Sequence, residues 1–228
     1  MTPPDPTHIF HITALENLQQ ILAAGELRAK RSLEQEDTGY TNIAHTTIQD
    51  RRLHTPVPCG PGGVLHDYVP FYFGPRSPML FTLSKGNVEG FTGGQQSIVH
   101  IVSSVQRVEA AELGFVFTDG HGIMELTDFY DDLIGLNEID WPLMRAHYWA
   151  DTDEDPDRKR RRQAEFLVHG RFPVELIIGI GVMQKSKVFQ SHCICMRRSR
   201  LITRSPSQIT DCLKSLICQF LIDALLRI

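Results

Sequence analysis

The stretch at residues 51–81 constrains the fold more than any other part of the chain. It reads RRLHTPVPCGPGGVLHDYVPFYFGPRSPMLF and alternates turn signals with apolar runs. Glycine and proline mark turns because they free or fix the backbone dihedral angles. The pattern therefore predicts a loop, a strand at residues 68–73, a turn, and a second strand that begins at Met79. A purely structural pair of strands does not require the polar side chains that interrupt this stretch: His66, Asp67, Tyr68, Tyr72 and Arg76.

The flanking segments predict a mixture of strands and helices. Residues 9–13 are expected to form a buried strand, and apolar residues at helical spacing then predict a helix that ends at Gly25. Residues 97–105 and 173–182 are rich in β-branched or apolar residues and predict buried strands. Residues 26–50 show no clear period until their end, TTIQDRR, which predicts a short helix. A polar segment of this length within a compact domain is often a functional loop.

Composition is typical of a globular protein and argues against several classes. The 228 residues, 42% hydrophobic and 22% charged, suffice for one large domain with a sizeable core. The net charge of −4 is mild evidence against broad binding of nucleic-acid phosphates over the whole surface. It still allows a local basic groove. No apolar stretch is long enough to span a membrane and no signal peptide is evident, so we expect a cytoplasmic protein. The five scattered cysteines fit reduced thiols better than disulfides.

Helical spacing of apolar residues recurs in the second half of the chain. It is rough at residues 127–134 and 141–149 and regular at 211–228, where it predicts an amphipathic helix that packs on the core or binds a partner. We expect three parts: a loose Pro-rich tail at residues 1–7, a main domain at 8–190, and a C-terminal segment at 191–228 that ends in this helix.

Four motifs, in order, resemble the DarT family of toxins, which attach ADP-ribose to single-stranded DNA with NAD as donor. They are IFHITALENLQQILAAG at residues 9–25, GGVLHDYVPFYFGPRSPML at 62–80, FVFTDGHG at 115–122 and RRQAEFLVHG at 161–170. The resemblance implies an α+β fold of the ADP-ribosyltransferase type: two packed, mainly antiparallel sheets with flanking helices around an NAD cleft. The main domain is then the catalytic domain. The likeness is weak after residue 188, where family members usually end in an aromatic-bearing strand.

The resemblance implies two catalytic residues. Glu165 matches the glutamate of the family motif QAEFLV, and a fixed carboxylate can stabilise the positive charge that develops on the ribose when nicotinamide leaves. Without the motif, a solvated glutamate at the start of a strand is the simpler interpretation. Arg52 aligns with the functional arginine of the family, although a shift by one residue selects Arg51. Because arginine stays protonated, it is a poor general base. Arg52 can instead stabilise a thymine anion or position the base against C1′ of the ribose. The structural alternative is simple pairing with a phosphate or a carboxylate.

The remaining site residues also follow from the resemblance. His11, Thr13, Asn17, Arg52 and Tyr72 match positions that bind NAD, and Met79 and His121 match positions that bind the DNA substrate. Each has a structural alternative, such as a core histidine bonded to backbone or plain packing in a strand.

Residues 158–162 form a run of five basic residues after the acidic block 151–157. This run either follows DNA phosphates or forms a solvated face paired with the acidic block. His192, Cys193 and Cys195 lack a second ligand pair at zinc spacing, so we expect no metal.

The resemblance therefore implies an enzyme that transfers ADP-ribose from NAD to thymine in single-stranded DNA. The implied partners are single-stranded DNA and a macrodomain antitoxin, and we expect a monomer that does not contact membranes. Two alternatives stay open: an ADP-ribosyltransferase with another acceptor (guanine, RNA or protein), and a non-catalytic module that binds NAD or nucleic acid.

Overall fold

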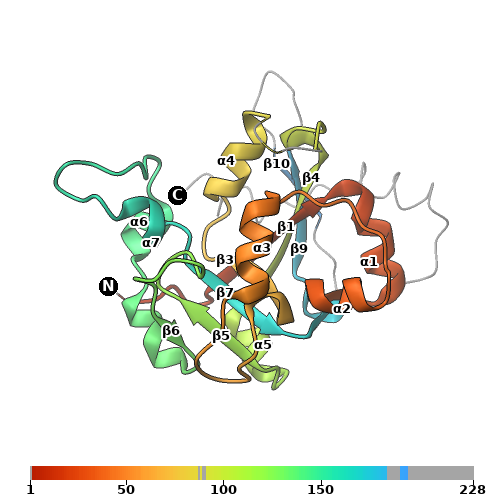
Figure 1. Ribbon diagram of the computed structural model, residues 1–228, viewed down its shortest axis with the longest axis horizontal. Helices are drawn as coiled ribbons and strands as arrows, with labels where there is room; N and C mark the ends of the chain where they lie inside the picture. The colour runs from red at the N-terminus through yellow and green to blue at the C-terminus, as the bar shows by residue number, and fades with distance from the viewer. Residues whose placement is uncertain (1, 87, 89–90, 184–190, 195–228) are drawn as a thin grey trace.

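The structure is a computed structural model that describes residues 2–86, 88, 91–183 and 191–194 (Figure 1). Its strands are β1 (His8–Ala14), β2 (Glu26–Arg28), β3 (Tyr68–Tyr72), β4 (Ile98–Ser104), β5 (Phe115–Thr118), β6 (Phe129–Tyr130), β7 (Glu165–His169), β8 (Arg171–Pro173), β9 (Gly179–Met183) and β10 (Ser191–Ile194). Its α-helices are α1 (Leu18–Ala24), α2 (Lys30–Gln35), α3 (Thr46–His54), α4 (Pro78–Ser84), α5 (Val105–Ala110), α6 (Trp141–Arg145) and α7 (Arg158–Arg161). Short 3-10 helices are η1 (Leu15–Asn17), η2 (Leu65–Asp67), η3 (Gln95–Ser97), η4 (Leu133–Glu138) and η5 (Val174–Leu176).

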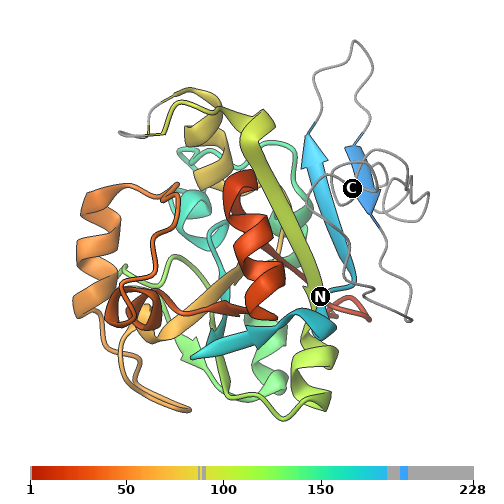
Figure 2. The same ribbon diagram turned by 90° about the vertical axis from the view of Figure 1, so that its right-hand side faces the viewer.

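The described strands form one large and one small antiparallel sheet. The large sheet has the order β10-β9-β4-β1-β3-β7-β5-β6, and the small sheet pairs β2 with β8. Seven registered pairs join β1 to β4, but only Phe10 and Tyr72 register between β1 and β3. The large sheet therefore consists of two halves, β10-β9-β4-β1 and β3-β7-β5-β6, which are joined by one registered pair of residues. These halves correspond to the two packed sheets that the family resemblance implies. Figure 2 shows β4 and β9 running side by side in one of these halves.

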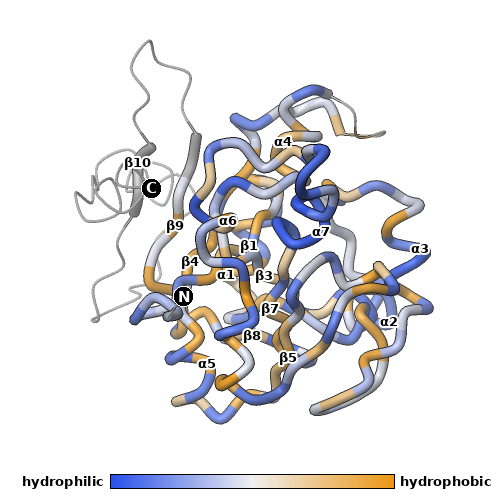
Figure 3. The backbone as a smooth tube through the Cα atoms, turned by 90° about the vertical axis from the view of Figure 1, so that its left-hand side faces the viewer, coloured by the Kyte–Doolittle hydropathy of each residue, from blue (hydrophilic) through white to orange (hydrophobic). Residues whose placement is uncertain are grey.

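Apolar residues from both halves meet in the main core. β7 is buried along Glu165, Phe166, Leu167 and Val168, so both of its faces are covered. Phe166 stacks on Phe115 and Phe117, and further aromatic rings pack around these. Figure 3 shows apolar residues along the interior strands and hydrophilic residues at α7. The predicted buried strands at 9–13 and 97–105 correspond to β1 and β4, and the predicted helices correspond to α1 and α3. Only the second half of the strand predicted at 173–182 is confirmed, as β9, because residues 174–176 form η5.

The second apolar run of residues 51–81 is a helix, so the prediction of a strand from Met79 is wrong. The Ser77 hydroxyl accepts a hydrogen bond from the Leu80 amide (3.1 Å), and Pro78 lies in the first turn of α4. Serine at the N-cap and proline just after it are typical helix starts. Leu80 and Leu83, three residues apart, are buried on one face. This cap outweighs the strand-like run of apolar residues.

Two further segments differ from, or fall outside, the sequence-based expectations. The helical spacing at 127–134 is realised as β6 and part of η4, and that at 141–149 gives only the five-residue α6. β10 pairs with β9, whereas the amphipathic helix predicted at 211–228 lies outside the described residues. Within the described part of the chain, no helix is long and apolar enough to cross a membrane.

Candidate active site

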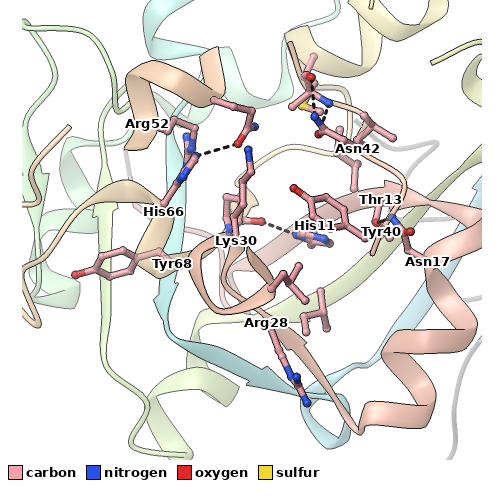
Figure 4. Close-up of a pocket in the computed structure, with 18 of the residues that line it drawn as sticks. His11, Thr13, Asn17, Arg28, Lys30, Tyr40, Asn42, Arg52, His66 and Tyr68 are labelled. Atoms are coloured by element: carbon pink, nitrogen blue, oxygen red, sulfur yellow. Dashed lines mark hydrogen bonds between the residues drawn. The ribbon is translucent and has the colours of Figure 1, made fainter. Parts of the chain in front are cut away.

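A pocket of about 760 Å³ lies where β1 and β3 adjoin, with α3, α4 and residues 38–45 contributing to its wall (Figure 4). Its volume falls in the range of sites for small molecules and cofactors, roughly 300–1,000 Å³. The lining includes every site residue predicted from the sequence: His11, Thr13, Asn17, Arg52, Tyr72, Met79, His121 and Glu165. These residues are far apart in sequence, and the fold brings all of them to one cavity.

Glu165 and Arg52 form a buried ion pair in the wall of this pocket. Nη1 of Arg52 lies 2.7 Å from Oε2 and 3.0 Å from Oε1 of Glu165. Glu165 is only 2% exposed and Arg52 only 7%. Burial alone raises the pKa of Glu165, but the charge of Arg52 and the nearby His121 outweigh it and lower the pKa to about 2. Glu165 is therefore ionised at neutral pH.

The strand register and the adjoining turn fix Glu165. Tyr72 on β3 pairs in register with Glu165, the first residue of β7. The Glu165 amide donates a hydrogen bond to the Thr118 hydroxyl (3.1 Å), and this hydroxyl donates to the Gly120 carbonyl (2.7 Å). The Gly122 amide adds a long hydrogen bond to Oε1 of Glu165 (3.4 Å). The carboxylate is thus positioned by backbone as well as by arginine.

The structure distinguishes Arg52 from Arg51. Successive residues of an α-helix point about 100° apart, so the two side chains of α3 leave the helix in different directions. Arg51 is exposed, and its Nη2 donates to the Ile123 carbonyl (2.8 Å). Arg52 faces Glu165, and its buried Nη2 has no hydrogen-bond partner among the described residues. The geometry therefore favours Arg52 as the arginine that acts with Glu165.

His121 lies beside the same carboxylate. Its Nδ1 is 3.2 Å from Oε1 of Glu165, although the ring is not aligned for a hydrogen bond. The turn that carries it is tied down, because the His121 amide donates to the Arg160 carbonyl (3.1 Å) and the Thr127 hydroxyl to the His121 carbonyl (2.9 Å). A Cβ on the preceding residue, Gly120, would lie 2.5 Å from Nη1 of Arg160, so a larger residue there would displace the Arg160 side chain.

His11 is held in a neutral form. Burial lowers its pKa to about 4, and its Nδ1 lies 2.8 Å from the Pro70 carbonyl. A carbonyl can only accept a hydrogen bond, so Nδ1 carries the proton and Nε2 is left as an acceptor.

Asn17 connects a segment of the pocket wall to β1. Its Nδ2 donates to the Thr13 hydroxyl (3.0 Å) and the Thr41 carbonyl (2.9 Å), and its Oδ1 accepts from the Thr41 amide (2.8 Å). Asn17 lines the pocket, but its amide group is committed to these bonds. It therefore fastens residues 38–45, which include the pocket-lining Tyr40 and Asn42, to the end of β1.

Tyr72 and Met79 meet across the pocket wall. The Tyr72 hydroxyl donates a hydrogen bond to Sδ of Met79 (3.6 Å). Burial, with the negative charge of Glu165 as the second cause, raises the pKa of Tyr72, so the phenol remains neutral. An uncharged aromatic surface thus lies next to the charged pair.

Lys30, Gln49 and His66 are among the polar lining residues that sequence reasoning did not assign to the site. Nε2 of His66 lies 3.0 Å from Oε1 of Gln49, and burial together with the charge of Lys30 lowers the pKa of His66 to about 4. His66 did stand out as a polar residue within an apolar stretch, but its partner on α3 is 17 positions away. No local pattern indicates that Lys30 faces a cavity.

The basic run at residues 158–162 is largely paired within the protein. Arg160 contacts Asp157 (2.8 Å) and Asp119 (3.0 Å), and Arg161 contacts Asp140 and Asp155. Arg162 is buried and donates hydrogen bonds to the carbonyls of Leu143, Met144 and Arg76. These contacts favour a basic run that pairs with acidic and carbonyl groups of the protein over one that binds DNA phosphates.

Replacement of Arg162 by methionine is therefore expected to lower the free energy of unfolding by about 3 kcal/mol, because it removes the donors of three carbonyls. Lys159→Met is the matched control: Lys159 is exposed, and we expect a change within about 0.5 kcal/mol. Urea denaturation followed by circular dichroism measures both. An Arg162→Met protein of unchanged stability that binds single-stranded DNA less tightly would restore the phosphate-binding interpretation.

An antiparallel sheet that divides beside a pocket, with an ionised glutamate held in the pocket wall, agrees with the ADP-ribosyltransferase fold that the family resemblance implies. The family model described as "ssDNA thymidine ADP-ribosyltransferase, DarT" matches residues 10–207. A DNA ADP-ribosyl transferase of Thermus sp. (strain 2.9) is 48% identical over 181 residues, which are 79% of this chain and 83% of the relative.

Solved structures of a Thermus relative agree with this assignment. Thermus sp. 2.9 DarT in complex with ADP-ribosylated ssDNA has a TM-score of 0.75 at 46% identity and covers 81% of this chain and 85% of its own. The same relative in complex with NAD+ has a TM-score of 0.71 at 44% identity, with the same coverage. The chain therefore belongs to the DarT family, and it is an NAD-dependent DNA ADP-ribosyltransferase.

Proposed function

We propose that this protein transfers ADP-ribose from NAD to a thymine base of single-stranded DNA, with Glu165 and Arg52 as its catalytic residues. The observation that carries the proposal is the buried ion pair between these two residues in the wall of a cofactor-sized pocket. The family description and the relatives solved with NAD+ and with ADP-ribosylated ssDNA support the donor and the acceptor.

Glu165 acts on the donor. The bond between C1′ of the ribose and the nicotinamide nitrogen breaks, nicotinamide leaves with the electron pair, and positive charge develops on the ribose. A carboxylate with a pKa of about 2 carries its negative charge before the reaction begins. Its burial excludes water, so the electrostatic stabilisation is stronger than in solution and requires no reorganisation.

Arg52 acts on the acceptor. Within DNA, N3 is the ring nitrogen of thymine that carries a proton, because N1 is bonded to the deoxyribose. In the transfer, N3 forms the new bond to C1′ and its proton leaves to solvent. Arginine does not accept this proton, since it stays protonated. Its charge stabilises the developing thymine anion, and Nη2, which has no partner among the described residues, is the group that contacts the base.

The other pocket residues bind and orient the substrates. Nε2 of the neutral His11 accepts a hydrogen bond from a ribose hydroxyl, and Thr13 lies beside it on β1 to contact the nicotinamide end. Tyr72 and Met79 offer an apolar wall for the nicotinamide ring and the thymine ring. Asn17 contributes indirectly, because it holds residues 38–45 over the pocket.

His121 and Lys30 supply polar and positive groups at the pocket. Nδ1 of His121 lies near Glu165, where it meets the acceptor base, and Lys30 lies on the pocket side of α2, where its ammonium group faces the NAD phosphates.

A panel of acceptors tests the proposal. The purified protein is incubated with NAD and one of four substrates: a thymine-containing single strand, the same strand without thymine, its duplex, or a uracil-containing RNA. Intact-mass spectrometry is expected to detect one added ADP-ribose on the first substrate alone, because the base must be unstacked to enter the pocket. Modification of guanine, of RNA or of the protein itself would contradict the thymine assignment.

We further propose that the protein acts as a cytoplasmic monomer and is countered by a macrodomain antitoxin that removes the modification. The antitoxin is implied by the family resemblance, whereas the location and the monomer are expectations from the sequence. Size-exclusion chromatography with light scattering tests the monomer, and release of ADP-ribose from the modified strand by an added macrodomain hydrolase tests the partner.

A further inference from the structure

An exposed group of aromatic side chains lies outside the pocket, beside α4. Phe81 on α4 is 52% exposed, and its ring packs edge-on against Trp149, with the centroids 5.9 Å apart and the planes at 87°. Tyr148, the residue before Trp149, is 81% exposed. We call Phe81, Tyr148 and Trp149 the outer platform. None of its three residues lines the pocket. Trp149 is partly buried against the main core, and the active site as described does not explain the exposure of Phe81 and Tyr148.

The outer platform continues the wall of the pocket. Met79 and Thr82 on α4 line the cavity, and Phe81 lies between them in sequence. With about 100° per residue, Phe81 points about 60° from Pro78, which also lines the cavity, and about 160° from Met79. Phe81 therefore lies on the solvent side of α4, next to the edge of the pocket wall that Pro78 forms. Figure 1 shows α4 between α3 and the segment that joins α6 to α7, the segment that carries Tyr148 and Trp149.

Cationic side chains lie near parts of the outer platform. Nζ of Lys85 lies 5.2 Å from the centroid of the Phe81 ring, and Nη1 of Arg76 lies 2.8 Å from Nδ1 of His147. Arg145 is exposed at the end of α6. Of the acidic residues that follow Trp149, Asp151 and Asp155 are paired with cations of the basic run. Asp153 and Glu154 lie farther along this loop, which projects away from α4 in Figure 1.

We propose that the outer platform is a subsite that stacks the nucleobases next to the target thymine. Single-stranded DNA is the occupant that this chemistry fits, because exposed aromatic rings stack on bases of any sequence and nearby cations pair with the backbone phosphates. The inference rests on the proposed function, since it places the flanking nucleotides around a thymine in the pocket. It assigns binding of the substrate, and not chemistry, to Phe81, Tyr148 and Trp149.

Two matched oligonucleotides test the subsite. Both carry one thymine and have the same length, but one has bases on its flanking nucleotides and the other has abasic flanks with the same phosphates. For the wild-type protein, abasic flanks are expected to raise the KM for DNA roughly 5- to 100-fold, the effect of losing the stacking of one base. In the Phe81→Ala, Trp149→Ala protein the two oligonucleotides should have nearly equal KM. Phe81→Tyr, which keeps a ring, should retain the wild-type difference.

Two controls separate stacking from other effects. Ile134 is 75% exposed on η4, so Ile134→Ala removes an exposed apolar side chain elsewhere and should retain the wild-type difference. Melting temperatures of all variants check folding. Fluorescence gives an independent measurement, because the chain has two tryptophans and Trp141 is buried in the core. DNA with intact bases is expected to quench the emission of a Glu165→Gln protein, and Trp149→Phe in that background should abolish the quenching.

The outcomes distinguish this inference from the proposed function. If the wild-type protein modifies thymine and its KM does not depend on the flanking bases, the subsite is wrong and the proposed function stands. If the difference persists in the double variant, the flanking bases bind elsewhere, and the outer platform is free for a protein partner. If the wild-type protein modifies neither oligonucleotide, the proposed function itself fails.

Discussion

Glu165→Gln is expected to lower the rate of ADP-ribose transfer about 1,000-fold, because it removes the buried charge that faces the ribose. The substitution keeps the shape of the side chain and one acceptor oxygen, so NAD should still bind. The expected signature is therefore a large fall in kcat with little change in the Kd for NAD. Nicotinamide release with single-stranded DNA present measures the rate, and isothermal titration calorimetry measures the Kd.

The ion pair complicates this variant, since loss of the carboxylate leaves Arg52 buried and unpaired, which typically destabilises a protein by about 3–5 kcal/mol. A melting curve of Glu165→Gln must show a folded protein at the assay temperature. Glu109→Gln changes an exposed glutamate on α5 and should leave kcat at the wild-type value. Transfer by a folded Glu165→Gln protein at a rate within about tenfold of wild type would remove Glu165 from the mechanism.

Arg52→Lys is expected to lower kcat about 100-fold, and Arg51→Lys much less. Lysine keeps one positive charge but loses the planar fork, so a single ammonium group cannot hold the Glu165 carboxylate and stabilise the thymine anion together. Arg51 is exposed, and its Nη2 donates a hydrogen bond to the Ile123 carbonyl. The two variants make the same change at adjacent positions of α3. Steady-state assays with saturating NAD and varied DNA compare them.

A structural role of Arg52 alone predicts a different result. In that case Arg52→Lys would lower the melting temperature and leave the kcat of the remaining folded protein unchanged. A larger fall in kcat for Arg51→Lys than for Arg52→Lys would reverse the assignment of the two arginines.

The sequence predicted the strands and the pocket residues well because both depend on local signals. β-branched runs predict β1, β4 and β9, and the four family motifs carry seven of the eight predicted site residues, all of which line the pocket; Arg52 lies outside the motifs. The error at α4 arose because a short apolar run is ambiguous between helix and strand, and the N-cap at Ser77 decided it.

Pairings across the chain could not be predicted. The bonds of Asn17 to Thr41 and of Arg162 to the carbonyls of Leu143 and Met144 connect segments that only the folded chain brings together. For the same reason, the charge run at 158–162 showed five cations but not their partners. The choice between Arg51 and Arg52 likewise needed the direction in which each side chain leaves α3.

The central claim is that this pocket joins ADP-ribose to a thymine base. The most direct test is to fragment the modified oligonucleotide by tandem mass spectrometry and locate the attached group. We predict one ADP-ribose on the thymine base, with none on the DNA incubated with the Glu165→Gln protein. Attachment to a phosphate, a sugar or another base, or an unmodified strand with intact NAD, would contradict the account.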